Sequence, residues 1–180
     1  MSEQSRIIGR HTTLEDRKTQ DLNLDQIKVA IFDFDETLAL HKDKDYTKHR
    51  SATEESFAKF FIAAYTKPEG FYDDVEPCTV NEPLLRLIQD LRERGAKLYC
   101  LSGMKYSFHF EAKRAFVRAH YGDDIEMLFA ASQEKKLECA KVLAKMNDCR
   151  LDEVLFVDDR RDVIELMEKN GIIAIQAKNE

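Results

Sequence analysis

The sequence predicts an α/β fold, a Rossmann-like three-layer sandwich with helices on both faces of a mainly parallel sheet. Short apolar runs alternate along the chain with longer segments whose apolar residues recur every three or four positions, as expected for alternating strands and helices. The apolar runs lack polar alternation, which is typical of strands buried on both faces. The length of 180 residues suits one domain with a substantial core.

The composition excludes several classes of protein. The chain is 43% hydrophobic and 34% charged, with a formal net charge of −6, which does not favour a broad nucleic-acid-binding surface. No stretch approaches the ~18 consecutive apolar residues of a membrane span, and the first twenty residues lack the apolar core of a signal peptide. We therefore expect a cytoplasmic protein without a membrane partner. The four cysteines form no C-x-x-C pair, so neither a zinc site nor a disulfide framework is expected.

A polar N-terminal arm, residues 1–24, is expected to precede one domain over residues 25–180. The first predicted strand, residues 28–34, is an apolar run that leads into Asp33 and Asp35. Residues two apart on a strand face the same way, so these carboxylates should stand together where the strand reaches solvent. Two adjacent buried carboxylates are costly unless a cation or a shared proton compensates. The pair therefore predicts a metal site, a catalytic site, or both.

A small insertion, at about 41–80, follows the first strand. Residues 41–50 are rich in His, Lys and Arg but are interleaved with aspartates, so a solvated loop is favoured over an anion-binding cluster. The spacing of Ser51 and Glu54 is that of a capping box and predicts a helix. The apolar face of this helix contains Phe57, Phe60, Phe61 and Ala64. The insertion is too short for a full cap domain, so we expect an open site.

The remaining elements alternate in the same way. Asn81 and Pro83 predict the start of a helix that Gly95 ends. Further strands are expected at 97–101, 127–131, 154–157 and 172–175, and further helices at about 105–120, 134–146 and 163–167. Within the helix at 105–120, the apolar positions are Phe108, Ala112, Ala115, Phe116 and Ala119.

Three of the predicted strands stop at polar residues. Asp33 and Asp35 end the first, Ser102 follows the second, and Asp158 and Asp159 follow the strand at 154–157. The carboxyl ends of parallel strands meet at one edge of the sheet, where α/β proteins bind their ligands. These residues therefore predict a single site at that edge.

The first two of these strand ends resemble motifs of the haloacid-dehalogenase (HAD) superfamily. Asp33-x-Asp35-x-Thr37 after a buried strand is similar to the first motif, and residues 98–103, Leu-Tyr-Cys-Leu-Ser-Gly, are similar to the second. Glu36 replaces a glycine common at its position, and this D-x-D-E-T form resembles phosphatase branches of the superfamily.

Two further motifs follow in the order of that superfamily. A lysine that opens a helix, Lys135 or Lys136, resembles the third, and residues 155–162, Leu-Phe-Val-Asp-Asp-Arg-Arg-Asp, resemble the fourth. Lys136 is preferred because apolar residues at three, four and seven positions after it share its helix face. The resemblance covers about residues 28–175.

The resemblance implies the roles of the residues around the first two motifs. Asp33 is expected to be the nucleophile that attacks phosphorus. Asp35 is expected to be the general acid and then the base, which requires a pKa raised above its ordinary ~3.9. Thr37 is expected to orient the loop through its hydroxyl. Ser102, followed by Gly103, is expected to donate a hydrogen bond to a phosphoryl oxygen.

The resemblance also implies Mg²⁺ as the cofactor. Asp33, the backbone carbonyl of Asp35 and Asp158 are expected to bind the ion, a count that suits Mg²⁺. Asp162 is expected to hold a metal-bound water or Lys136, and Asp159 is the alternative ligand. Lys136 would offset the charge of phosphate and of the acids.

These residues predict a Mg²⁺-dependent phosphatase that hydrolyses a phosphomonoester through an aspartyl-phosphate. The expected substrate is a phosphorylated small molecule or nucleotide, or the phosphorylated end of a macromolecule. Two alternatives stay open: a phosphotransferase with an acceptor other than water, and a non-enzymatic protein that binds metal or phosphate on the same fold.

Overall fold

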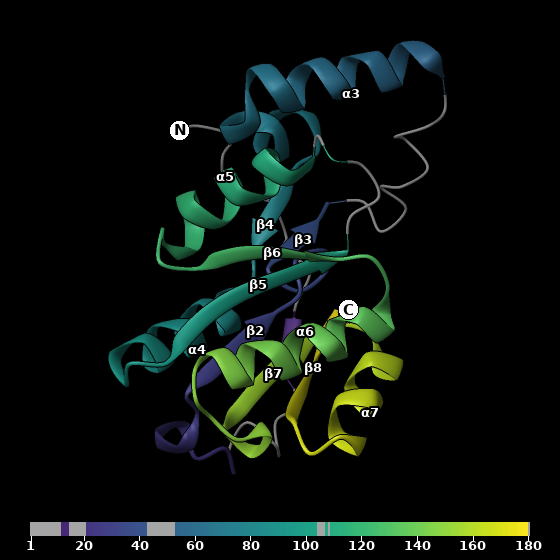
Figure 1. Cartoon of the computed structure of the whole chain (residues 1–180). Coiled ribbons are helices and arrows are strands. Elements are labelled where there is room, and N and C mark those ends of the chain that lie inside the picture. The colour runs from purple at the N-terminus through teal and green to yellow at the C-terminus, as the bar shows by residue number, and fades with distance from the viewer. Residues whose placement is uncertain (1–11, 15–20, 43–52, 104–106, 108, 180) are drawn as a thin grey trace.

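The central feature of the protein is a mixed six-stranded sheet in the order β1-β8-β7-β2-β5-β6 (Figure 1). The computed structural model describes residues 12–14, 21–42, 53–103, 107 and 109–179. The strands of this sheet are β1 (Thr12–Leu14), β2 (Val29–Phe32), β5 (Lys97–Gly103), β6 (Glu126–Ala130), β7 (Val154–Asp158) and β8 (Ile173–Asn179). All neighbouring strands are parallel except β1, which runs antiparallel to β8.

Helices cover both faces of the sheet. One face packs against α4 (Glu82–Glu93) and α5 (His109–Tyr121), and the other against α6 (Gln133–Met146) and α7 (Arg161–Lys169). Alternate residues of β2 enter the two cores: Ala30 and Phe32 on the first face, Val29 and Ile31 on the second. Both faces of the strand are therefore apolar, and the predicted three-layer α/β class is confirmed.

The segment between β2 and α4 builds a small substructure beside α5. Its strands β3 (Ala39–His41) and β4 (Cys78–Val80) pair antiparallel. Between them lie α3 (Glu54–Thr66), the 3₁₀ turn η2 (Pro68–Gly70) and the π-helical turn η3 (Phe71–Val75). These elements pack on α5, and Figure 1 shows α3 next to α5 at one end of the molecule, with α7 at the other. Two further 3₁₀ turns, η1 (Leu24–Gln26) and η4 (Leu151–Glu153), precede β2 and β7.

Several element boundaries differ from the sequence prediction. Asn81 caps α4 as expected, but Thr53 caps α3, and the predicted cap Ser51 lies outside the described residues. The strand β5 continues through Ser102 and Gly103. The strands β1, β3 and β4 were not predicted, because three residues give too short a pattern to recognise.

The buried stripe of α5 also differs from the prediction. It consists of His109, Ala112, Lys113, Phe116, Val117 and Tyr121. Ala119 is exposed and Ala115 only half-buried, while Phe108 lies outside the described residues. The stripe includes a lysine, Lys113, which a pattern of apolar residues could not predict and whose ammonium forms an ion pair with Asp35.

Within the described part of the chain, no helix is both long and apolar enough to cross a membrane. The four cysteines are free thiols.

A buried tyrosine of α5, Tyr121, links the loop after β2 to the start of α4. The Tyr121 hydroxyl donates a hydrogen bond to the Leu38 carbonyl at 2.6 Å and accepts one from the Asn81 amide at 2.9 Å. The Asn81 side chain donates in turn to the Thr37 carbonyl at 2.9 Å. These bonds fix the loop after β2 against the start of α4.

We expect Tyr121→Phe to lower the free energy of unfolding by about 1–3 kcal/mol, because it leaves a buried carbonyl and a buried amide without their partner. Urea denaturation followed by circular dichroism measures this change. Tyr65→Phe is the control, since Tyr65 is 61% exposed and should leave stability unchanged. Equal stability of the two variants would contradict this role of Tyr121.

Candidate active site

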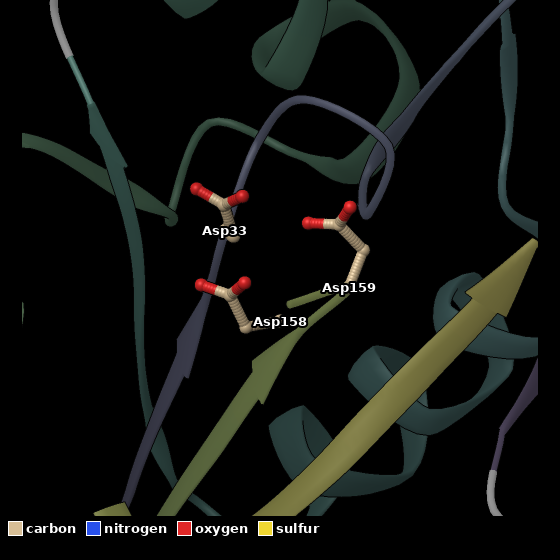
Figure 2. A group of neighbouring side chains, drawn as sticks. All are labelled: Asp33, Asp158 and Asp159. Carbon is tan, nitrogen blue, oxygen red and sulfur yellow. The ribbon is translucent and has the colours of Figure 1, made fainter. Parts of the chain in front are cut away.

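Three carboxylates gather at the carboxyl ends of β2 and β7 (Figure 2). Asp33 directly follows β2, Asp158 ends β7, and Asp159 comes next along the chain. One oxygen from each lies within 4.8 Å of the others. The Asp33 amide donates to the Val157 carbonyl at 2.9 Å, which extends the pairing of the two strands up to the cluster. Strand order reverses at β2, so this is the switch point at which α/β sheets bind ligands.

Lys136 is the cation that contacts two of these carboxylates, Asp33 and Asp158. Its ammonium donates to Asp33 Oδ1 at 2.9 Å and to Asp158 Oδ2 at 2.7 Å, and the side chain is only 2% exposed. Ser132 caps the helix α6 and so sets the first turn from which Lys136 projects. Lys135, the alternative from the sequence, is exposed and forms an ion pair with Glu138.

The cluster carries more negative charge than Lys136 neutralises. Burial raises the pKa of Asp33 to about 6 against the opposing Lys136 ammonium, and the Asp158 and Asp35 carboxylates add to the rise. Burial, with Asp33 and Asp158, raises the pKa of Asp159 to about 7. Both shifts indicate that a further cation would stabilise the ionised cluster. An all-oxygen donor set of this kind fits Mg²⁺.

Asp162 lies outside this group, in contrast to its predicted place at the metal or at Lys136. Its carboxylate binds the Arg160 guanidinium at 2.7 Å and is 63% exposed. Position 162 belongs to the first turn of α7, which has already left the sheet edge. Asp159, still in the loop, takes the third place in the cluster. The Arg160 amide donates to Asp158 Oδ1 at 2.9 Å.

Asp35 lies between two cations, Lys113 and His41, and has no contact with Lys136 among the described residues. Lys113 Nζ is 2.6 Å from its Oδ2, and His41 Nε2 is 2.9 Å from its Oδ1. Burial by itself would raise the pKa of Asp35, but the Lys113 ammonium and the His41 ring hold that pKa well below its ordinary value. The sequence prediction of a raised pKa is therefore wrong for this state of the protein.

His41 is held as an imidazolium. Burial alone would lower its pKa, but hydrogen bonds with Asp35, Cys78 and Glu76 raise the pKa of His41 to about 11. The sequence interpretation assigned this residue to a solvated basic loop, and the structure instead buries it at 1% exposure. Lys42 is exposed, and the basic residues Lys44, Lys48, His49 and Arg50 lie outside the described residues.

Ser102 lies beside Asp35 at the end of β5. Its hydroxyl is buried, accepts a hydrogen bond from Lys113 Nζ at 2.8 Å and donates to the Gly103 carbonyl at 3.1 Å. Lys113 therefore connects the loop after β2 with the end of β5. Sequence reasoning missed Lys113, although its place between Ala112 and Phe116 in an amphipathic helix was a detectable sign of a buried lysine.

Thr37 and Glu36 shape the loop after β2. Thr37 is fully buried, and its hydroxyl has no hydrogen-bond partner among the described residues. Glu36 has a φ of 58°, in the left-handed region that favours glycine, which accounts for the glycine common at this position. The Glu36 carboxylate accepts a hydrogen bond from the His41 amide at 3.2 Å.

Neither a protein-family model nor a curated protein sequence matches the chain, but solved structures do. A predicted HAD-like family hydrolase from Porphyromonas gingivalis shares 15% identity over 86% of this chain and 92% of its own, with a TM-score of 0.54. A phospho-aspartyl intermediate analogue of phosphoserine phosphatase shares 18% identity over 81% of this chain and 84% of its own, with a TM-score of 0.52. The magnesium complex of a HAD family enzyme from Bacteroides thetaiotaomicron shares 18% identity over 85% and 94%, with a TM-score of 0.50. The chain therefore has the α/β fold of the HAD family enzymes.

Proposed function

We propose that the protein is a Mg²⁺-dependent phosphatase that hydrolyses phosphomonoesters through an aspartyl-phosphate on Asp33. The observation that carries this proposal is the cluster of Asp33, Asp158 and Asp159 at the sheet edge, with the Lys136 ammonium bound to Asp33 and Asp158. Phosphoryl transfer needs positioning and electrostatic stabilisation more than covalent assistance. A carboxylate nucleophile among cation-binding carboxylates and a buried lysine offers both.

Asp33, Asp158 and the backbone carbonyl of Asp35 are the proposed ligands of Mg²⁺, with Asp159 beside them. When bound, the ion would offset the negative charge of the carboxylates and of the substrate phosphate. Mg²⁺ usually binds only one or two carboxylates directly and keeps several waters. Asp159 would then accept a hydrogen bond from one of these metal-bound waters. A magnesium complex in a protein of this fold supports the assignment.

In the first step an oxygen of Asp33 attacks phosphorus, and the bond between phosphorus and the ester oxygen breaks. Asp35 gives its proton to the leaving oxygen, and in the second step it takes a proton from the water that hydrolyses the aspartyl-phosphate. Lys136 holds Asp33 in place, and Ser102 is proposed to donate to a phosphoryl oxygen. The phospho-aspartyl analogue of phosphoserine phosphatase, a protein of the same fold, supports such an intermediate.

The low pKa of Asp35 in the free protein is compatible with this role. The arriving phosphate brings negative charge next to Asp35, while Lys113 and His41 stay in contact with its carboxylate. Nearby negative charge raises the pKa of a carboxyl group. Substrate binding would therefore favour the protonated form that the first step requires.

The first prediction concerns turnover. We expect the purified protein to release phosphate from p-nitrophenyl phosphate with Mg²⁺ and to stop when a chelator is added. Asp33→Asn should lower kcat by about 10⁴-fold or more, because the nucleophile is lost. Phosphate release by a colorimetric assay measures both effects, with Asp162→Asn as the active control.

Three results would redirect the proposal. Unchanged turnover in Asp33→Asn would exclude the aspartyl-phosphate. Release that depends on an added alcohol or sugar would favour a phosphotransferase. Metal binding without release from a panel of nucleotides, sugar phosphates, phospho-amino acids and nucleic-acid ends would favour a binding protein.

The second prediction concerns the metal ligands. We expect Mg²⁺ to raise the melting temperature, since a ligand at about 100 times its Kd stabilises the folded state by about 2.7 kcal/mol. Asp159→Asn should weaken Mg²⁺ binding about tenfold or more, the range seen for groups that orient metal ligands. Asp162→Asn should leave it unchanged. Isothermal titration with Mg²⁺ measures the affinities, and the opposite ranking would restore Asp162 as the residue at the metal.

A further inference from the structure

Both oxygens of the Asp35 carboxylate are held, each by a different buried cation. Lys113 from α5 binds Oδ2 at 2.6 Å, and His41 from β3 binds Oδ1 at 2.9 Å. The Lys113 side chain is 3% exposed and the His41 side chain 0%, whereas that of Asp35 is 25% exposed. Packing alone therefore does not fix Asp35, and its orientation depends on these two bonds.

His41 is itself locked in place by the small sheet of the insertion. In the register of β3 and β4 it lies opposite Cys78, whose sulfur is 3.4 Å from His41 Nδ1. The Glu76 carboxylate is 3.3 Å from the same nitrogen, and the His41 amide donates to Glu36. The ring therefore presents Nε2 to Asp35 with little rotational freedom.

Lys113 reaches across two elements of the site. Besides Asp35, it donates to Ser102 Oγ at 2.8 Å and contacts the Gly103 carbonyl at 3.4 Å. Its ammonium also lies 4.9 Å from the centre of the Phe34 ring. One buried cation thus sets the position of Asp35 relative to the hydroxyl at the end of β5.

We propose that Lys113 and His41 are positioning residues that hold the Asp35 carboxylate in one orientation beside Ser102, ready for proton transfer to the leaving oxygen. This inference rests on the proposed function, because it assumes that Asp35 is the general acid. Proton transfer requires hydrogen-bond reach to the reacting oxygen, and a misplacement of about 1 Å can cost about 10²-fold in rate. Two anchors on separate elements restrict a carboxylate more than either alone.

The test compares two substrates that differ in their need for an acid. p-Nitrophenyl phosphate releases p-nitrophenolate, a good leaving group that needs no protonation. β-Glycerol phosphate would release a poor alkoxide leaving group unless the ester oxygen is protonated. We expect Lys113→Met and His41→Gln to lower kcat/KM for β-glycerol phosphate by about 10- to 100-fold more than for p-nitrophenyl phosphate. Lys113→Arg, which keeps a cation, should retain more kcat/KM for β-glycerol phosphate, relative to p-nitrophenyl phosphate, than Lys113→Met does. The control is Lys59→Met, an exposed lysine in an ion pair with Glu55 on α3.

A double-mutant cycle removes the acid itself. If Lys113 acts through Asp35, Lys113→Met in an Asp35→Asn background should change the β-glycerol phosphate rate by less than about threefold. Circular dichroism establishes that each variant is folded. If Lys113→Met does not fold, the same two substrates are compared with His41→Gln and Lys113→Arg.

An equal loss on both substrates, or a full additive loss in the Asp35→Asn background, would overturn the positioning role. If the wild-type protein releases phosphate from both substrates and the variants show the same ratio of the two kcat/KM values as the wild type, this inference is overturned but the proposed function is not. Wild-type protein that releases phosphate from neither would overturn the proposed function and this inference with it.

Discussion

The site depends on one buried interaction, the contact of the Lys136 ammonium with the carboxylates of Asp33 and Asp158. All three side chains are almost completely buried, and removing one partner of a buried ion pair typically costs about 3–5 kcal/mol because it leaves an uncompensated charge. Burial opposes ionisation of Lys136, yet the two carboxylates hold its pKa above its usual range. The ends of β2 and β7 and the start of α6 are thus held together by charge as well as by packing.

A second buried lysine organises the other half of the site. Lys136 joins Asp33, the nucleophile candidate, to Asp158, the proposed metal ligand. Lys113 joins Asp35, the acid/base candidate, to Ser102. The two environments drive the carboxyl pKa values apart: the pKa of Asp33 rises to about 6, and that of Asp35 falls well below its ordinary value. Two aspartates two residues apart thus acquire different chemical properties from their neighbours, not from their own side chains.

The sheet confines the charged side chains of the site to the ends of its strands. Strands β2 and β7 are apolar on both faces, so charged side chains can lie only at the strand ends. The insertion does not stand apart from this edge: it supplies His41 through β3 and holds it through Glu76 and Cys78. A segment expected only as a small cap thereby takes part in the site itself.

Much of the site could be predicted because its signals are local. The apolar run before Asp33, the run that ends in Asp158, and the helix start at Lys136 are each visible within about ten residues. The position of Asp162 could not be predicted, because a spacing of four residues from Asp158 does not show that α7 has already left the sheet edge. Sequence alone determined the alternation of strands and helices and the residue types at the strand ends. Only the tertiary structure decided that Lys113 pairs with Asp35, 78 positions away, since groups so far apart in the sequence come within hydrogen-bond distance only once the sheet and α5 have packed together.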